Sequence, residues 1–303
     1  MGMLEGKTVA VTGGGAGIGR AVCLASAAAG ANVVVCDYGV AMDGSDPSSE
    51  VADAVVAEIT AAGGNAVALA GDVSKFATGE QVVAAAVDTW GSIDGVACVA
   101  GNLRERMLFN MSEDEFDSVI AVHLKGHFNI YRHASAVMRK QPNGGSIIGF
   151  TSGAHIGSTA QANYSAAKGG IVSLARSVAA GMYKYGVRSN VIAPVAKSRM
   201  SGNVPFGIEM GEPEDVAPMV GFLLSDRSTD VTGQIYTANG GKIAVWNQPV
   251  EVREMRTDGR WTIDGIADRF SEVGQEELGL IKVLAEREAA AKAAKESGST
   301  PNQ

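Results

Sequence analysis

The chain has 303 residues, of which 46% are hydrophobic, and a formal net charge of −8. This acidic balance, without a long basic run, argues against a nucleic-acid partner, and no apolar stretch is long enough to cross a bilayer. The three cysteines and four histidines show no spacing typical of a disulfide framework or a metal site. We therefore expect a cytoplasmic protein without a metal, a membrane span or a nucleic-acid partner.

Short apolar runs alternate with longer amphipathic segments, which indicates a parallel sheet with helices on both faces. Strands are expected at residues 7–12, 32–37, 66–70, 95–100, 145–151, 187–193 and 234–238, the last of the sheet. Helices are expected at residues 18–29, 50–62, 74–90, 112–139 and 161–185, and one more begins at residue 213. Ser74 is expected to cap the third helix, and Ser112 and Glu115 have the spacing of a capping box. The pattern predicts an α/β protein with a single doubly wound parallel sheet, a Rossmann fold.

The composition changes near residue 245, so we expect a Rossmann domain over residues 1–245 and a C-terminal extension over residues 246–303. Within the extension, a helix is expected at residues 263–270 and a solvated, Ala-, Glu- and Lys-rich helix at residues 276–295. Residues 297–303 are expected to be disordered. Three roles are open for the extension: a packing arm, a partner contact or a charged tail.

A glycine-rich turn, Thr12-Gly-Gly-Gly-Ala-Gly-Ile-Gly19, joins the first strand to the first helix. Glycines there let the backbone turn tightly and approach a pyrophosphate, while the helix N-terminus offers free amides and a partial positive charge. The spacing of Gly13, Gly17 and Gly19 differs from the common Gly-x-Gly-x-x-Gly fingerprint. A plain glycine-rich turn is therefore the alternative to a dinucleotide site.

Two acidic residues follow the second and third strands. Asp37 ends the second strand, where a carboxylate accepts hydrogen bonds from both ribose hydroxyls and repels a 2′-phosphate. Neither neighbour of Asp37 supplies a compensating cation, which favours NAD over NADP. Asp72 closes the third strand and either receives the adenine amino group or has a helix-capping role before Ser74.

Tyr164 and Lys168 stand one helical turn apart in Asn163-Tyr-Ser-Ala-Ala-Lys168, so their side chains share a helix face. A free tyrosine has a pKa of about 10 and is a poor base at neutral pH. A nearby ammonium favours the phenolate and lowers that pKa, which would let the pair exchange a proton with an alcohol or carbonyl oxygen. The alternative is a packed aromatic beside a solvated lysine.

Together these motifs resemble the classical short-chain dehydrogenase/reductase family, in the family's order, over roughly residues 4–242. The resemblance implies that Ser152 polarises the substrate oxygen, Tyr164 is the general acid/base, and Lys168 holds the nicotinamide ribose and lowers the tyrosine pKa. It implies NAD as the cofactor and a homodimer or homotetramer as the assembly. The cofactor contacts that it implies are Thr12, Gly13, Gly17, Ile18, Gly19, Asp37, Asp72, Val73, Ala100, Gly101, Tyr164, Lys168, Pro194 and Ala196.

The serine assignment has an alternative. Aligned along the strand from Ser146, the family's serine falls on Ser152, whereas a count back from Tyr164 places it on Thr151. We prefer Ser152, because strand alternation fixes its direction and the following loop can absorb a deletion.

The chain also departs from the family pattern. His123 stands where the family has the helix asparagine that relays protons through water. A histidine can also relay a proton, and the alternative is a buried, neutral, hydrogen-bonded imidazole. The family's second asparagine in Asn-Asn-Ala-Gly is here Val99, and Val195 replaces the glycine that usually follows the proline.

Several stretches are similar to one subgroup, the dehydrogenase part of peroxisomal multifunctional enzyme type 2, which oxidises (3R)-hydroxyacyl-CoA and whose relatives act on steroids. The resemblance lies in residues 102–106, 122–126, 161–168 and 193–200, whereas the segment that would close over substrate, 201–211, is short. Arg104 and Arg106 are candidate contacts for CoA phosphates, or else pair with Glu105 or Glu113 in a solvated loop.

The sequence thus predicts an NAD-dependent oxidoreductase that interconverts a secondary alcohol and a ketone, with a 3-hydroxyacyl-CoA or a hydroxysteroid as the substrate. Two other classes of function remain open. One is a non-catalytic sensor of NAD, suggested by the altered Val99, His123 and Val195. The other is a scaffold that works through the C-terminal extension.

Overall fold

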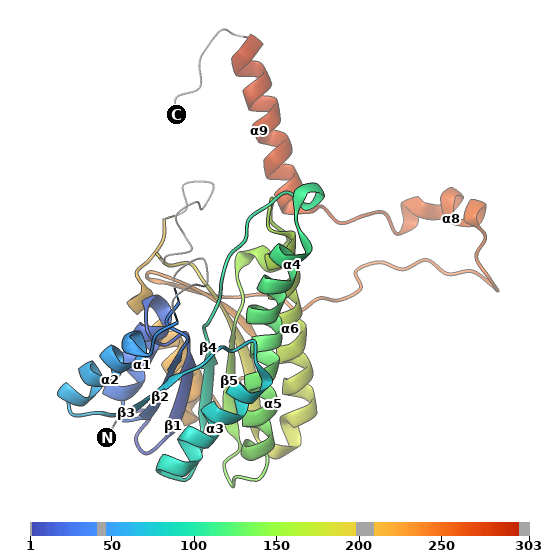
Figure 1. Ribbon diagram of the computed structural model, residues 1–303. Coiled ribbons are helices and arrows are strands. Elements are labelled where there is room, and N and C mark those ends of the chain that lie inside the picture. Colours follow the sequence, from blue (N-terminus) through green and yellow to red (C-terminus); the bar gives the residue numbers. More distant parts are fainter. Residues whose placement is uncertain (1, 41–46, 198–208, 297–303) are drawn as a thin grey trace. The chain divides into compact units, whose positions relative to one another are not determined.

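The computed structural model describes residues 2–40, 47–197 and 209–296. The chain divides into two units, Met1–Trp246 and Asn247–Gln303. The first unit holds a large sheet with helices around it, and the second holds the helices α8 (Ile263–Arg269) and α9 (Gly279–Glu296) (Figure 1). None of the helices in the described ranges has the length and apolar content that crossing a membrane requires.

The described residues form an eight-stranded sheet in the order β3-β2-β1-β4-β5-β6-β7-β8. Strands β1 to β7 are parallel, and β8 pairs antiparallel with β7. The strand bounds are β1 (Thr8–Thr12), β2 (Asn32–Asp37), β3 (Asn65–Ala70), β4 (Gly95–Cys98), β5 (Gly145–Phe150), β6 (Val187–Pro194), β7 (Ile235–Asn239) and β8 (Lys242–Val245). The strand order reverses between β1 and β4, where open α/β sheets bind ligands beyond the carboxyl ends of their strands.

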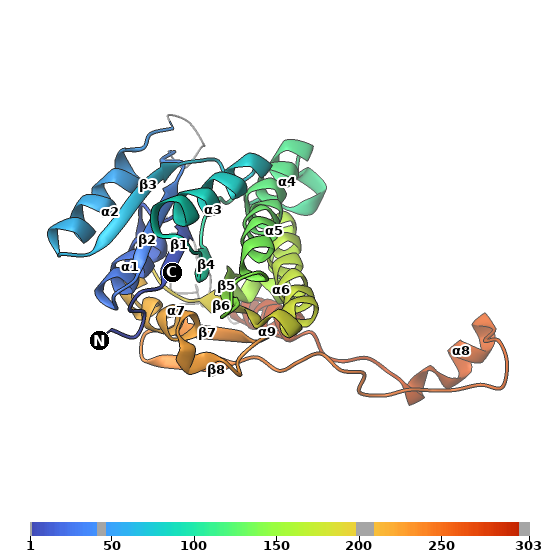
Figure 2. The same cartoon turned by 90° about the horizontal axis from the view of Figure 1, so that it is seen from below.

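Helices cover both faces of this sheet (Figure 2). One face packs against α1 (Gly17–Ala28), α2 (Glu50–Ala61) and α7 (Ala217–Leu224). The other packs against α3 (Phe76–Trp90), α5 (Gly126–Met138) and α6 (Ala162–Met182). The doubly wound parallel sheet predicted from the sequence is confirmed.

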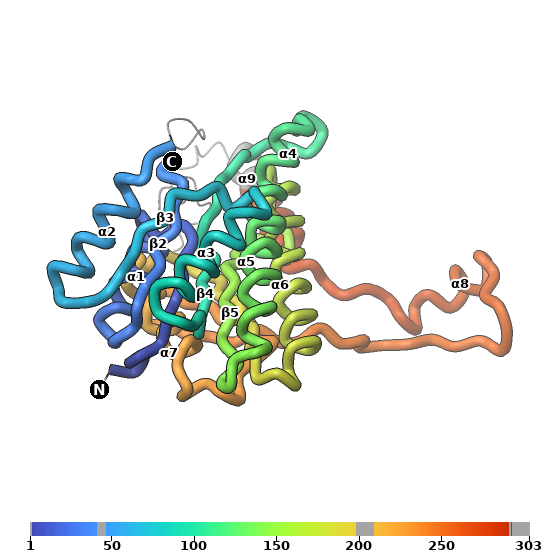
Figure 3. The backbone as a smooth tube through the Cα atoms, turned by 60° about the horizontal axis from the view of Figure 1, so that its bottom comes forward, coloured from blue at the N-terminus to red at the C-terminus, as the bar shows by residue number. Residues whose placement is uncertain are grey.

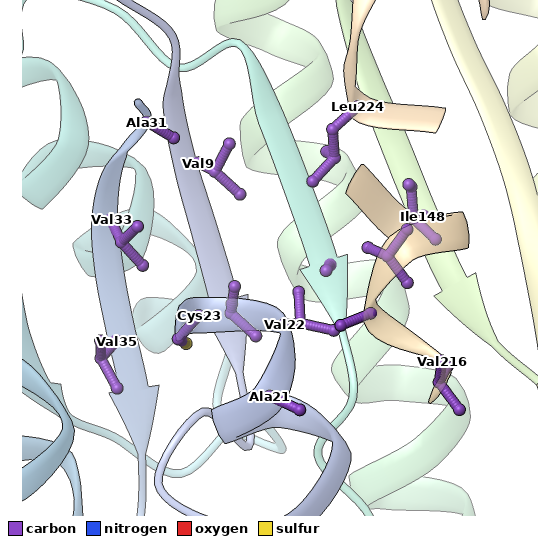
Figure 4. Packing of buried hydrophobic residues seen from close by; sticks show 14 of the residues in the cluster. Val9, Ala21, Val22, Cys23, Ala31, Val33, Val35, Ile148, Val216 and Leu224 are labelled. Carbon is purple, nitrogen blue, oxygen red and sulfur yellow. The ribbon is translucent and has the colours of Figure 1, made fainter. Parts of the chain in front are cut away.

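Strand alternation divides the core in two. Val9 and Val11 of β1 lie in the cluster beneath α1, whereas Ala10 between them lies in the opposite cluster. The first cluster continues through Val33 and Val35 of β2 to Ile148 of β5 (Figure 4). Because both faces are apolar, β1 is buried along its whole length. This packing fixes the carboxyl ends of the central strands.

The expected helix at residues 112–139 is not one uniform helix. It begins with the predicted capping box, in which Ser112 Oγ accepts from the Glu115 amide (3.2 Å) and Glu115 Oε2 from the Ser112 amide (2.8 Å). The α-helix α4 (Glu113–Ile120) then widens into a π turn, Ala121–Lys125, before α5 begins. Figure 3 follows this path from α4 into α5. The wider turn contains His123. The periodicity of apolar residues in the sequence does not reveal that the helix widens at this point.

Three further expectations need correction. Ser74 does not cap the third helix, because α3 begins after Lys75 and has no side-chain cap. The strand at residues 234–238 is not the last, because a tight turn at Gly240 returns the chain as β8. The predicted helix at residues 161–185 ends as an α-helix at Met182 and finishes in a short 3₁₀ turn.

The second unit has two helices near the predicted positions. Thr262 caps α8 by accepting a hydrogen bond from the Gly265 amide. Between residues 247 and 290 every side chain is partly or fully exposed, so this stretch has no hydrophobic core of its own. The end predicted to be disordered, residues 297–303, lies outside the described residues.

Candidate active site

The glycine-rich turn lies at the carboxyl end of β1, and its shape requires glycine. Gly13 and Gly17 have φ angles of +69° and +50°, in the left-handed region that favours glycine. A Cβ on Gly13 would lie 2.7 Å from the Ala100 amide nitrogen, and one on Gly19 would lie 1.9 Å from the Gly13 carbonyl oxygen. The turn therefore packs directly against the chain leaving β4.

The start of α1 fits a pyrophosphate. Its N-cap residue, Ala16, offers no side-chain cap, and no acidic residue occupies the first turn. A Cβ on Gly17 would meet nothing within 4 Å, so the space over the helix end is open. Uncapped amides beside open space are the arrangement that binds phosphate at a helix N-terminus. Thr12 is buried and Ile18 is half-buried beneath the turn.

Asp37 lies at the end of β2 and faces the same turn. Its Oδ2 accepts a hydrogen bond from the Gly15 amide and its Oδ1 accepts one from the Gly39 amide, each at 2.8 Å. A Cβ on Gly15 would lie 2.9 Å from the carboxylate, so Gly15 lets the turn approach Asp37. Sequence reasoning assigned no role to Gly15. The site therefore presents a carboxylate where the adenine ribose of a dinucleotide would lie.

Asp72 lies in the turn before α3 and does not take the helix-capping role that was its alternative, because the start of α3 has no side-chain cap. Its Oδ1 accepts a hydrogen bond from the Ser74 amide at 2.9 Å, which closes the turn before α3. The neighbouring Val73 is buried, and its carbonyl accepts a hydrogen bond from Asn129 Nδ2 at 2.7 Å. These contacts join the loop after β3 to α5.

Ser152, Tyr164 and Lys168 come together at the carboxyl end of β5. Tyr164 and Lys168 share one face of α6, and the Lys168 Nζ atom lies 5.3 Å from the centroid of the tyrosine ring. Ser152 follows β5, and its hydroxyl is near enough to the phenol of Tyr164 to act against the rise in the pKa of that phenol. Thr151 is occupied elsewhere, because its hydroxyl donates to the Lys168 carbonyl at 2.9 Å. Of the two candidate hydroxyls, Ser152 is the one beside the tyrosine.

Burial decides the ionisation of this pair. It lowers the pKa of Lys168 to about 7, and the ammonium donates to the Phe150 carbonyl at 2.7 Å. It raises the pKa of Tyr164 to about 12, although the Ser152 hydroxyl acts in the opposite direction. The sequence led us to expect a lowered tyrosine pKa. That direction was wrong for the cofactor-free protein, because removal of the phenolate from water dominates.

His123 adopts the buried, hydrogen-bonded form that was one of its two alternatives. Its Nε2 lies 2.7 Å from the Asn102 carbonyl oxygen and 3.2 Å from the Asn102 amide nitrogen, so the tautomer decides whether this nitrogen donates or accepts. Its ring meets the Tyr164 ring edge-on at 5.2 Å. Burial and then the charge of Lys168 lower its pKa, which keeps the imidazole neutral. Its Nδ1 is buried and has no hydrogen-bond partner among the described residues.

The chain leaving β4 passes directly over this imidazole. A Cβ on Gly101 would lie 2.4 Å from the His123 Cε1 atom, so only glycine fits there. Pro194 ends β6 on the same side of the sheet, and Ala196 forms a bridge with Gly211. The segment expected to close over substrate, residues 201–211, lies mostly outside the described residues, which omit 198–208.

Asn163 is a buried connector that sequence reasoning did not single out. Its Nδ2 donates to the Arg104 carbonyl (3.0 Å) and the Glu115 carbonyl (2.8 Å), and its Oδ1 accepts from the Tyr164 amide (2.7 Å). It thereby fixes the start of α6 against α4 and the loop after β4. Its position directly before Tyr164 was the available signal.

One of the two loop arginines pairs differently from the expectation. Arg106 forms an ion pair with Glu115 at 2.8 Å, and not with Glu105 or Glu113, so the expected pairing was wrong. This contact and the Ser112 amide lower the pKa of Glu115 to about 2. The guanidinium of Arg104 donates to the Leu103 carbonyl at 2.9 Å. Arg106 therefore braces α4 in this structure.

Comparison with known proteins agrees with this arrangement. The sequence profile described as Enoyl-(Acyl carrier protein) reductase matches residues 13–242. The chain is 42% identical over 273 residues to hydroxyacyl-CoA dehydrogenase ChsB1 of Mycobacterium tuberculosis, covering 84% of each chain. A crystal structure of a short chain dehydrogenase from Mycobacterium avium superposes with a TM-score of 0.80 at 43% identity, covering 91% of this chain and 98% of the other.

A longer relative matches over part of its length. The chain is 37% identical to peroxisomal multifunctional enzyme type 2 of Mus musculus, covering 89% of this chain but 37% of that protein. The matched region contains the glycine-rich turn and the serine, tyrosine and lysine whose geometry is described above. The chain belongs to the short-chain dehydrogenase/reductase family of oxidoreductases.

Proposed function

We propose that this enzyme is an NAD-dependent dehydrogenase that interconverts a secondary alcohol and a ketone, with a 3-hydroxyacyl-CoA thioester as its substrate. The observation that carries the proposal is the convergence of Ser152, Tyr164 and Lys168 after β5, at the edge of the parallel sheet where the uncapped α1 also begins after β1. A sensor of NAD would need the turn and Asp37 but not this trio. The geometry therefore favours catalysis over sensing.

Bound NAD⁺ would supply the hydride acceptor, and the chain's own residues would handle the proton. The Tyr164 oxygen takes the hydroxyl proton of the alcohol or returns it to the ketone. Ser152, whose hydroxyl influences the pKa of the phenol, would donate to the same substrate oxygen. Lys168 lies over the tyrosine ring, and its positive charge would favour the phenolate whenever it is protonated.

The choice of NAD rests on charge at the end of β2. Asp37 is held by two backbone amides, Gly15 and Gly39, so its carboxylate is fixed beside the glycine-rich turn. A fixed negative charge accepts hydrogen bonds from ribose hydroxyls and repels a 2′-phosphate.

The choice of substrate rests on the relatives. A relative that matches 84% of this chain and 84% of its own length is named a hydroxyacyl-CoA dehydrogenase, and peroxisomal multifunctional enzyme type 2 matches over most of this chain. A hydroxysteroid is the second candidate that the sequence suggested, and the two substrates are separable in one assay.

We predict that Tyr164→Phe lowers turnover by about 10²- to 10⁴-fold, because it removes the oxygen that carries the proton. Binding of NAD should change by less than about twofold, since the ring remains. Steady-state rates and NAD titration by fluorescence measure the two effects. Tyr183→Phe is the matched control, because Tyr183 is exposed on the turn after α6. A Tyr164→Phe enzyme with most of the wild-type rate would refute the assignment.

We predict opposite pH dependences for the two directions of reaction. Because burial raises the pKa of Tyr164 to about 12, the phenolate needed to accept a proton increases as pH rises toward that value. Alcohol oxidation should therefore accelerate from about pH 7 to about pH 10. The protonated phenol needed for ketone reduction already dominates at neutral pH. Initial rates in both directions test this, and identical profiles would contradict it.

We predict a preference for NAD over NADP that Asp37→Asn narrows by removing the charge that repels a 2′-phosphate. The ratio of kcat/KM for the two cofactors measures the effect. Asp53→Asn is the matched control, because it removes the same charge from an exposed position in the first turn of α2. Equal kcat/KM values with both cofactors in the unmodified enzyme would overturn this assignment.

We predict that a panel of secondary alcohols will give its highest kcat/KM with a 3-hydroxyacyl-CoA thioester. NAD reduction is followed at 340 nm with hydroxyacyl-CoA thioesters, hydroxysteroids, sugars and simple alcohols. The matching free hydroxy acid shows whether the CoA portion contributes binding energy. Activity confined to sugars or small alcohols would reject the acyl-CoA substrate while leaving the dehydrogenase chemistry intact.

A further inference from the structure

Beside the candidate active site, β5 extends one residue beyond its pairing with β4, and the side chain of His127 supplies the hydrogen-bond acceptor at that position. The last register pair of β4 and β5 is Cys98 with Gly149, while β5 continues to Phe150. The Phe150 amide therefore has no neighbouring residue on β4. It donates instead to Nε2 of His127 on α5, at 3.1 Å, and this imidazole is buried. The side chain thus replaces a strand in satisfying a buried backbone donor.

The opposite nitrogen of His127 fixes the ring's protonation. Nδ1 lies 2.7 Å from the His123 carbonyl oxygen, which can only accept, so Nδ1 carries the proton. Nε2 is then the acceptor that the Phe150 amide needs. Burial, followed by the charge of Lys168, lowers the pKa of His127 to about 3. The imidazole is therefore neutral, and each of its nitrogens has a partner.

Each residue that His127 hydrogen-bonds also contacts Tyr164 or Lys168. The carbonyl of Phe150, the residue whose amide His127 holds, accepts the Lys168 ammonium at 2.7 Å. His123, whose carbonyl His127 binds, packs its ring against Tyr164. His127 thus joins the π turn, the end of β5 and α6 at the place where the lysine and the tyrosine meet.

We propose that His127 is a positioning residue: it holds the Phe150 main chain so that the Phe150 carbonyl anchors Lys168 beside Tyr164. The inference rests on the proposed function only for its kinetic consequence. The geometric consequence, the location and environment of the Lys168 ammonium, is independent of any substrate. If His127 only filled space, an apolar side chain of similar volume would serve equally well. Both ring nitrogens of His127, however, make hydrogen bonds.

Two substitutions separate these possibilities. His127→Gln retains an amide oxygen that can reach the Phe150 amide, whereas His127→Leu fills space without an acceptor. Tyr131→Phe is the control: it removes another buried polar atom one turn further along α5, one that lies beside Gly149, and it keeps the aromatic ring. Circular dichroism verifies that each variant folds.

In His127→Leu we expect kcat to fall by about tenfold or more, because misplacement of a reacting group by about 1 Å can cost that much. KM for the alcohol should change by less than about twofold, and the pH profile of kcat should shift. His127→Gln should restore most of the rate, and Tyr131→Phe should match the wild type. Equal losses in the Gln and Leu variants, or a wild-type rate and pH profile in His127→Leu, would overturn the proposal.

A second readout does not depend on turnover. Nitrogen-15 NMR of the lysine side chains follows the titration of Lys168, and Lys168→Met identifies its signal. We expect the Lys168 midpoint to move in His127→Leu and to stay near the wild-type value in His127→Gln. An unchanged midpoint in His127→Leu would contradict the proposal even if the enzyme used none of the alcohols tested. If the wild-type enzyme turned over none of the alcohols but the Lys168 midpoint still shifted in His127→Leu, the proposed function would be rejected and the positioning role of His127 would stand.

Discussion

The burial of the Lys168 ammonium is the constraint on which the rest of the site depends. A lysine 3% exposed must have a hydrogen-bond acceptor, and here the acceptor is the Phe150 carbonyl at the end of β5. That arrangement requires β5 to extend beyond β4 and requires α6 to place its second turn against the strand end. Tyr164 and Ser152 then share the same small region, where burial acts on the ionisation of Tyr164 and Lys168.

The surrounding backbone is arranged to keep this region rigid. The π turn positions His123 against Tyr164, and Asn163 connects the start of α6 to α4 and to the loop after β4. Gly101 permits the loop to pass over the imidazole. The two hydrogen bonds of Asn163 to backbone carbonyls fix this side chain in place, so the protein's own contacts organise this part of the site.

The sequence predicted what local patterns encode. Alternating apolar runs predicted the parallel sheet, the glycines predicted the turn after β1, and the spacing of Ser112 and Glu115 predicted a capping box. It did not predict β8 or the π turn, and it did not predict the contacts of Asn163 with Arg104 and Glu115 or of His127 with Phe150, because those partners are distant in sequence. The direction of the Tyr164 pKa was wrong for the same reason: the burial that raises it is a property of the fold.

The most direct test of this account is the ionisation of Lys168 itself in the cofactor-free protein. Nitrogen-15 NMR of the lysine side chains, with Lys168→Met to assign the signal, gives the midpoint of its titration. The account predicts a midpoint near pH 7, because burial without a carboxylate partner disfavours the charge. A Lys168 that stays protonated up to about pH 10, as a solvated lysine does, would contradict it.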